Sequence, residues 1–164
     1  MSVGERARAI LARIPVGATL VAVSKTQPAE AIREAYAAGV RDFGENYAQE
    51  WRAKADALAD LADLQWHFIG SLQTNKARLL AGRVACVPAV DRPELARELS
   101  KRWAALGKTL KIFLEVNTGG EASKGGCAPA EAEALAAAVK ALPALELAGL
   151  MCIPPPEDDP RPHF

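Results

Sequence analysis

Lys25 is the side chain of this sequence whose position most favours chemistry. It follows the apolar run TLVAVS (19–24), and alternation along a strand would point its amine the same way as Val21 and Val23. A lysine forms a Schiff base with a carbonyl only when deprotonated, and partial shielding from water lowers its pKa from about 10.4 toward neutrality. The simpler alternative is a lysine that extends from the strand end into water.

Two more polar residues belong to the next two apolar segments. Asn46, after Glu45 in FGENY, has an amide that would hydrogen-bond a ligand's hydroxyl or, alternatively, cap the following helix. His67 lies within WHFI, which favours a core histidine with satisfied hydrogen bonds over a catalytic one. No carboxylate that would orient His67 is evident from the sequence.

Lys124 lies in the glycine-rich stretch NTGGEASKGG (117–126). Its ammonium group would meet a phosphate or a carboxylate there, or it is a solvated loop lysine. The stretch does not fit G-x-x-x-x-G-K-[ST], and SKTQP (24–28) replaces the G-x-G-x-x-G that a dinucleotide-binding sheet would carry. The usual sequence support for nucleotide binding is therefore missing.

The segments that must position these residues alternate in type from Ala18 onward. Short apolar runs and amphipathic helical stretches follow one another, which is typical of βα units around a parallel sheet. The expected strands are 19–24, 40–44, 66–69, 84–90, 110–116 and 145–153. The expected helices are an N-terminal surface helix within 1–14 and helices near 28–39, 45–61, 74–80, 91–107 and 128–142. Asp91 and Glu94 resemble a capping box, and Leu95, Leu99, Trp103 and Leu106 would line one helix face.

Length and composition indicate one domain, and six strands with their helices fit either an open doubly wound sheet or an interrupted barrel. Half of the 164 residues are apolar, enough for a substantial core, and 20 basic residues balance 20 acidic ones, so neither nucleic acid nor a membrane is favoured as a partner. Cys86, Cys127 and Cys152 are expected to be reduced, buried thiols of a cytoplasmic protein. No metal site is expected, because His67 and His163 are not at ligand spacing from a cysteine.

Five ordered motifs carry a resemblance to a known family: AVSKTQP (22–28), FGENYAQE (43–50), WHFIGSLQTNK (66–76), EVNTGGEASKGG (115–126) and GLMCIPPP (149–156). Together they resemble the pyridoxal phosphate homeostasis protein family. The resemblance implies a TIM-type β/α barrel of the alanine racemase N-terminal kind. It also implies pyridoxal 5′-phosphate (PLP) held as a Schiff base on Lys25, and a role in vitamin B6 and amino-acid homeostasis without an established reaction. Asn46 and His67 would lie around the cofactor, Met151 would approach from the sixth strand, and Lys124 would be a second amine near the site.

The sequence departs from that family at its C-terminal end. The family continues for about another third of its length, through two more strands and a serine- and glycine-rich segment that holds the cofactor phosphate. A complete barrel of this type takes about 250 residues. We therefore expect residues 1–164 to form a single PLP-binding barrel domain that is incomplete, with about six of eight strands and without its phosphate-binding part. A fragment, an interrupted reading frame and completion by another chain all remain open.

Two other functions are compatible with the sequence. A PLP-dependent amino-acid racemase needs a second base on the opposite face of the substrate α-carbon, and in the related racemases a separate C-terminal domain supplies it. An interaction fragment that has lost cofactor binding is the other alternative. The favoured hypothesis is a non-enzymatic protein whose partners are small molecules, namely PLP and amino acids. We expect it to be a monomer or to associate weakly with itself.

Overall fold

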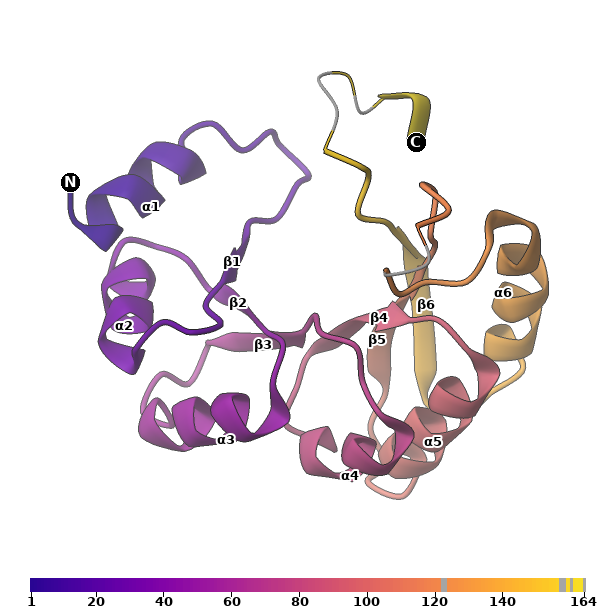
Figure 1. The fold of residues 1–164 in the computed structure, drawn as a ribbon. Helices are drawn as coiled ribbons and strands as arrows, with labels where there is room; N and C mark the ends of the chain where they lie inside the picture. The colour runs from indigo at the N-terminus through magenta and orange to yellow at the C-terminus, as the bar shows by residue number, and fades with distance from the viewer. Residues whose placement is uncertain (122–123, 157–158, 160, 164) are drawn as a thin grey trace. The chain divides into compact units, whose positions relative to one another are not determined.

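The computed structural model describes residues 1–121, 124–156, 159 and 161–163. The chain divides into two compact units, residues 1–69 and 70–164, and in each unit the helices lie along one side of the strands (Figure 1). No helix in the described part of the chain has the length and apolar character needed to cross a membrane.

The first unit contains three parallel strands and three helices. Its elements are α1 (Val3–Leu11), β1 (Val21–Val23), α2 (Ala29–Ala37), β2 (Asp42–Glu45), α3 (Ala48–Ala57) and β3 (Gln65–Phe68). β2 pairs with both β1 and β3, and the register places Val23 opposite Gly44 and Gly44 opposite His67. The carboxyl ends of these three strands are therefore aligned with one another.

The two faces of this sheet differ in character. Phe43 and Glu45 of β2 are 1% and 0% exposed and face the helices, whereas Asp42 and Gly44 face the other side because side chains alternate along a strand. Ser24, which follows β1, is also buried on the helix side. Lys25 follows Ser24 in the turn after β1, beyond the last strand residue Val23, so the expected direction of its amine stays a prediction.

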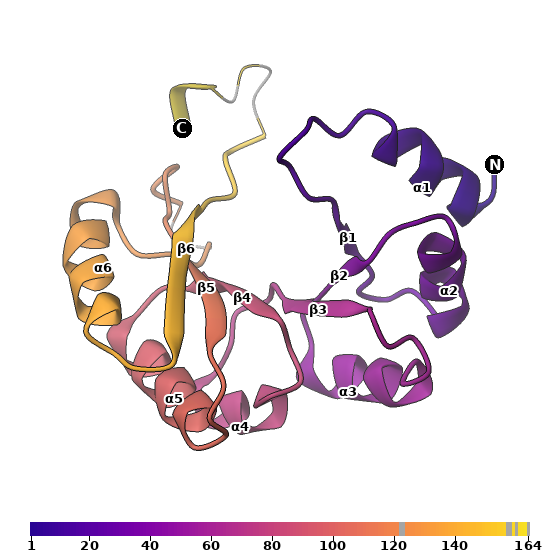
Figure 2. The same cartoon turned by 180° about the vertical axis from the view of Figure 1, so that it is seen from behind.

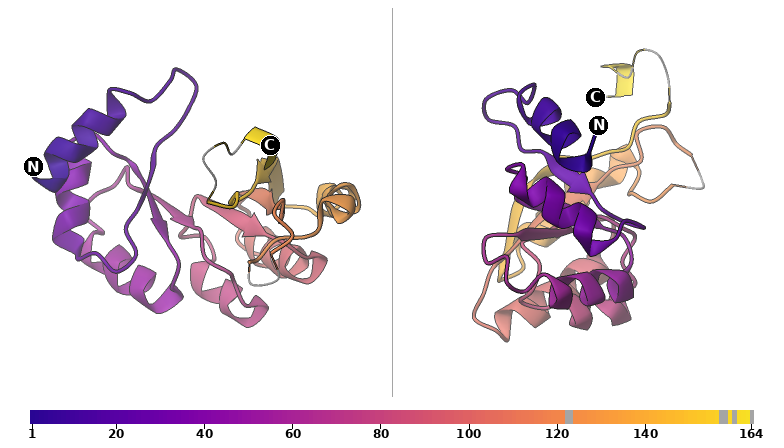
Figure 3. Two further views of the ribbon diagram at one scale, coloured as in Figure 1. Left: turned by 45° about the horizontal axis from the view of Figure 1, so that its top comes forward. Right: turned by 90° about the vertical axis from the view of Figure 1, so that its left-hand side faces the viewer.

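The N-terminal helix packs closely on α2, and the two lie side by side (Figure 3). Its buried residues are Gly4 and Ala7, and a Cβ at Gly4 would lie 3.3 Å from the carbonyl oxygen of Glu34. Ser2 and Glu5 form a capping box at its first turn. Small side chains thus set this contact, while Ile10, which is 46% exposed, stays at the surface.

The second unit repeats the arrangement. Its elements are η1 (Thr74–Lys76), α4 (Ala77–Leu80), β4 (Cys86–Val90), α5 (Pro93–Ala104), β5 (Leu110–Glu115), η2 (Pro129–Glu131), α6 (Ala132–Lys140), β6 (Leu145–Met151) and η3 (Arg161–His163). β5 lies between β4 and β6 and is parallel to both (Figure 2). Leu110, Ile112 and Leu114 of β5 are fully buried and form the centre of this unit's core.

All six expected strands are confirmed, together with the helices between them. The ends differ by small amounts: the strand expected over 19–24 is Val21–Val23, and the helix expected over 128–142 begins as the 3-10 turn η2 and continues as α6. The three cysteines are free thiols. Cys86 and Cys127 are buried as expected, whereas the expectation is wrong for Cys152, which is only partly buried.

Two expectations for α5 are wrong. The helix begins at Pro93 with Arg92 as its N-cap residue, without a side-chain capping bond, so Asp91 lies one residue too early to form the expected capping box. Its carboxylate instead accepts a hydrogen bond from Arg92 Nη1 at 2.6 Å. Leu106 is 50% exposed because the helix ends at Ala104, so only Leu95, Leu99 and Trp103 of the expected face are buried.

We expect Leu99→Ala to lower the free energy of unfolding by about 2–5 kcal/mol, since the side chain is fully buried and its loss leaves a cavity. Leu106→Ala is the matched control and should cost less than about 1 kcal/mol because half of that side chain is already in water. Urea denaturation followed by circular dichroism measures both. Equal losses in the two variants would contradict the packing described for α5.

Candidate functional site

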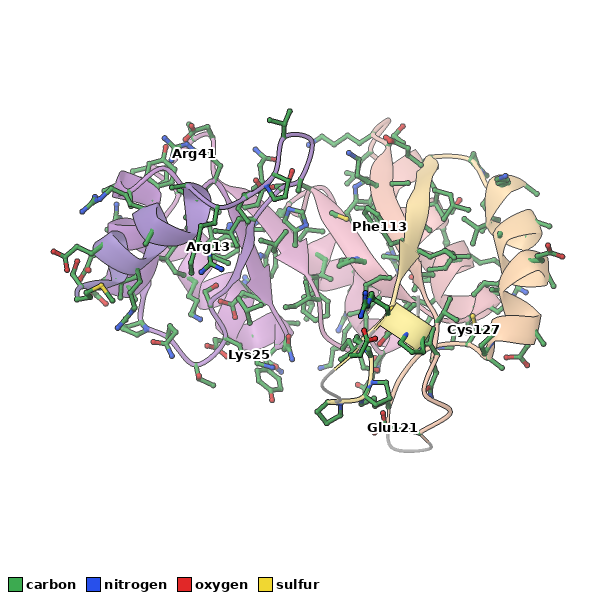
Figure 4. All side chains as sticks on the ribbon, turned by 90° about the horizontal axis from the view of Figure 1, so that it is seen from above. Arg13, Lys25, Arg41, Phe113, Glu121 and Cys127 are labelled. Atoms are coloured by element: carbon green, nitrogen blue, oxygen red, sulfur yellow. The ribbon has the colours of Figure 1, made fainter. Side chains whose placement is uncertain are left out.

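Lys25 lies at the carboxyl end of β1. Figure 4 shows it at the opposite end of the first unit's strands from Arg41, which precedes β2. Parallel α/β folds place their ligands at this edge of the sheet. The Lys25 side chain is exposed, so the residues of its own unit do not supply the shielding from water that the sequence led us to expect.

Asn46 occupies the equivalent position after β2. Its Oδ1 atom is buried and has no hydrogen-bond partner among the described residues. Tyr47 is the N-cap residue of α3 and no side chain caps that helix, so the alternative role of Asn46 as a helix cap is not what the structure shows. A buried, unpaired amide oxygen fits a ligand hydroxyl that would donate to it.

His67 has an orienting carboxylate, contrary to the expectation from the sequence. Its Nε2 atom lies 2.8 Å from Oδ1 of Asp42, and its side chain is 15% exposed. The parallel register between β2 and β3 brings together these two residues, which are far apart in the sequence, because Gly44 pairs with His67 and Asp42 with Gln65. His67 is thus a partly buried histidine held by a carboxylate, on the same face of the sheet as Asp42 and Gly44.

A buried ion pair lies directly behind Lys25 and Asn46, on the helix side of the sheet. Lys54 Nζ of α3 lies 2.7 Å from Oε1 of Glu45, whose side chain is 0% exposed, and 2.7 Å from Oε1 of Glu50. Ser24 Oγ donates to the same oxygen of Glu45 at 2.6 Å. The sequence interpretation missed this group, although a glutamate ending an apolar strand and an i,i+4 Glu–Lys pair on the next helix were visible signals.

In the second unit, Lys124 is tied to its own loop. Its Nζ atom lies 2.6 Å from Oε1 of Glu121 and donates to the carbonyl oxygen of Pro154 at 3.4 Å. Glu121 lies in the loop that follows β5, the strand that carries Phe113 (Figure 4). With 28% of its side chain exposed, Lys124 is not the freely solvated loop lysine of the simpler alternative.

Met151 is the last residue of β6 and pairs in register with Glu115, the last residue of β5. Glu115 also lines a small cavity with Lys124 and Ile153. The structure therefore brings Lys124 and Met151 to Glu115. In the first unit Lys25 and Asn46 follow β1 and β2, and His67 is the last residue but one of β3. The sequence interpretation missed Glu115, although it is the acidic residue that ends the otherwise apolar run of β5.

Burial raises the pKa of the Glu115 carboxyl, and the nearby negative charge of Asp91 raises it further. Asp91 itself is paired with Arg92 at 2.6 Å, which moderates but does not remove this repulsion. The folded chain therefore disfavours ionisation of Glu115 more than the unfolded chain does.

Residues 2–164 match the family model described as "Alanine racemase, N-terminal domain", and the chain belongs to this family. It is 55% identical over 144 residues to the pyridoxal phosphate homeostasis protein of Pseudomonas aeruginosa, which covers 88% of this chain and 62% of that protein. It is 46% identical over 149 residues to the protein of the same name in Escherichia coli, with 90% and 64% coverage. The resemblance inferred from the five motifs is confirmed, and the chain spans less than two thirds of these relatives.

Solved structures show the same fold. PipY of Synechococcus elongatus, in a structure without PLP, is 40% identical with a TM-score of 0.89, covering 96% of this chain and 74% of that one. A second PipY structure, with PLP bound, gives 39% identity and a TM-score of 0.86, with 95% and 72% coverage. An alanine racemase from E. faecalis shares the fold at 18% identity, with a TM-score of 0.74 and coverage of 92% and 41%. The barrel-like parallel α/β fold of this family is thereby confirmed over the open doubly wound sheet.

We expect Glu115→Gln to stabilise the chain at neutral pH by up to about 1 kcal/mol, a small effect because part of the side chain remains in water. A raised folded-state pKa means that wild-type Glu115 contributes fully to stability only below its ordinary pKa of 4.5, and that this contribution is lost as pH rises through the folded-state pKa. The gain in the variant should therefore disappear below about pH 4.5.

Thermal melts of wild type and variant between pH 4 and pH 8 measure this difference. Glu34→Gln removes an exposed carboxylate from α2 and should leave the melting temperature nearly unchanged at every pH. A gain that is constant across the pH range would show that ionisation of Glu115 is not its source.

Proposed function

We propose that this chain binds PLP, holding it as a Schiff base on Lys25, and that it acts in vitamin B6 and amino-acid homeostasis rather than as a catalyst. The observation that carries the proposal is the position of Lys25 at the carboxyl end of β1, together with the buried, unpaired Oδ1 of Asn46 at the end of β2, the strand that pairs with β1. Its relatives at 46–55% identity are named pyridoxal phosphate homeostasis proteins, and a 39% identical relative was solved with PLP bound.

The residues of the first unit suit this cofactor. When bound, PLP supplies an aldehyde that condenses with a primary amine with loss of water. Lys25 offers the amine, and Asn46 offers an acceptor for a ring hydroxyl. His67 would contribute a polar side chain whose orientation is fixed by Asp42. Lys124 and Met151 remain predicted contributors, on the basis of the family resemblance.

A racemase role is less well supported. Racemisation needs two proton-transferring groups on opposite faces of a carbon, and Lys25 serves one face. Of the two tyrosines, Tyr36 is engaged in a hydrogen bond to Asp63, and Tyr47 is an exposed residue at the start of α3. The solved alanine racemase at 18% identity shows the shared fold alone.

The wider setting follows from the same proposal. We propose PLP and amino acids as the small-molecule partners, a monomeric or weakly associating chain, and a cytoplasmic location in which the three free thiols stay reduced. We also propose that residues 1–164 act as a single PLP-binding domain. Gel filtration of the purified chain with and without PLP tests the oligomeric state.

We expect borohydride reduction of a PLP-loaded sample, followed by peptide mass mapping, to place the pyridoxyl group on Lys25. Lys25→Ala should reduce the labelling at least about tenfold, because one imine bond and its amine are lost. Lys101→Ala removes an exposed lysine of α5 and should label like wild type. Labelling chiefly on Lys124 or Lys76, with Lys25 unmodified, would overturn the assignment.

We expect no turnover of L-alanine by the PLP-loaded chain beyond about one event per chain, since Lys25 serves one face of the substrate α-carbon and racemisation needs a second proton-transferring group on the other face. Chiral chromatography of the incubated amino acid measures D-alanine. Many turnovers that disappear in Lys25→Ala would refute the non-enzymatic role.

A further inference from the structure

Both peptide groups that flank Lys25 are held by side chains of one helix. The carbonyl oxygen of Ser24, before Lys25, accepts a hydrogen bond from Lys54 Nζ at 2.7 Å. The amide N–H of Thr26, after Lys25, donates to Oε1 of Glu50 at 2.6 Å. Glu50 and Lys54 are one turn apart on α3, and Lys54 Nζ lies 2.7 Å from Glu50 Oε1. A single ion pair therefore hydrogen-bonds to the backbone on both sides of Lys25.

The backbone at this point has an unusual conformation that requires such support. Thr26 has φ of +62°, in the left-handed region, which a β-branched residue rarely adopts. A residue persists there only when its surroundings hold it, and such residues concentrate at functional sites. The bond from Glu50 fixes the amide of the strained residue itself.

The ion pair is itself anchored in the core. Lys54 also binds Oε1 of Glu45, which is fully buried and accepts from Ser24 Oγ. Because a buried charge without its partner is strongly unfavourable, these groups stay in place once the unit is folded. The bonds from Lys54 and Thr26 also hold the pKa of the Glu50 carboxyl below its usual range, so Glu50 is ionised at neutral pH.

We propose that Glu50 and Lys54 form a clamp that positions Lys25 for its carbonyl ligand by fixing the two peptide groups on either side of it. The inference rests on the proposed function, in which Lys25 binds PLP. Glu50 and Lys54 are positioning residues: they act on the backbone of residues 24–26 and not on the ligand. A lysine whose backbone is already fixed loses less conformational freedom when its amine bonds to a ligand, which strengthens binding.

The central experiment compares Glu50→Ala with wild type by two measurements. In the chain without PLP, hydrogen exchange of the Thr26 amide should accelerate by about tenfold or more, because its acceptor is gone. In PLP titrations with reductive trapping at Lys25, the apparent affinity should fall by about tenfold, the effect of losing one hydrogen bond to a charged group. The melting temperature should change little, since Glu50 is partly exposed and the Glu45–Lys54 pair remains.

Two conservative variants and one control separate positioning from general stability. Glu50→Gln keeps an acceptor for the Thr26 N–H and should restore most of the affinity and of the exchange protection. Glu50→Asp keeps the charge but withdraws it by one methylene, so it should behave like Glu50→Ala and covers the case in which the alanine variant does not fold. Glu34→Ala removes an exposed carboxylate from α2 and should match wild type in both measurements.

Wild-type affinity and wild-type Thr26 exchange in Glu50→Ala or Glu50→Asp would overturn the clamp. So would a loss of affinity that follows the melting temperature across all the variants, Glu34→Ala included. If PLP does not label Lys25 in the wild-type chain, the proposed function fails instead. The clamp is then judged by Thr26 exchange, and an unchanged rate in Glu50→Ala overturns it.

Discussion

The buried ion pair between Lys54 and Glu45 is the interaction on which the arrangement of the first unit depends. A fully buried carboxylate is tolerated only when a counter-charge and hydrogen bonds accompany it, and Lys54 and Ser24 supply both. These groups belong to α3, the end of β2 and the end of β1. Lys25 is the residue after Ser24 and Asn46 the residue after Glu45, so the residues proposed to meet the ligand are direct neighbours in sequence of residues in the buried network.

Apolar periodicity was enough to predict the strands, because the alternation of side chains within one strand is a local property. It did not predict the partners of the polar residues. Asp42 meets His67, and Glu115 pairs with Met151, through the register between two strands, and that register is set by helices and turns whose lengths differ from unit to unit. The pairing of Lys54 with Glu45 likewise required knowing how α3 lies against β2.

Family resemblance and geometry contribute different parts of the account. The five motifs indicated the family and, through it, the cofactor, which no spacing of residues in this chain would have identified. Geometry added what the motifs do not carry: an unpaired amide oxygen at Asn46, a carboxylate that fixes His67, and a glutamate at position 115 whose ionisation is disfavoured. The two sources agree on Lys25 because a strand end is where both the motif and the chemistry require an amine.

The alternation that separates the two faces of the first sheet also limits how this segment can change over evolution. Ser24 is turned to the helices, and its neighbour Val23, opposite Gly44, is on the other face. Inserting or deleting one residue here would exchange the faces and turn Ser24 away from Glu45 and Lys54. Length variation among homologues should therefore accumulate in the turn over residues 12–20, before β1, while the spacing from Val21 to Thr26 stays fixed even where the residue types drift.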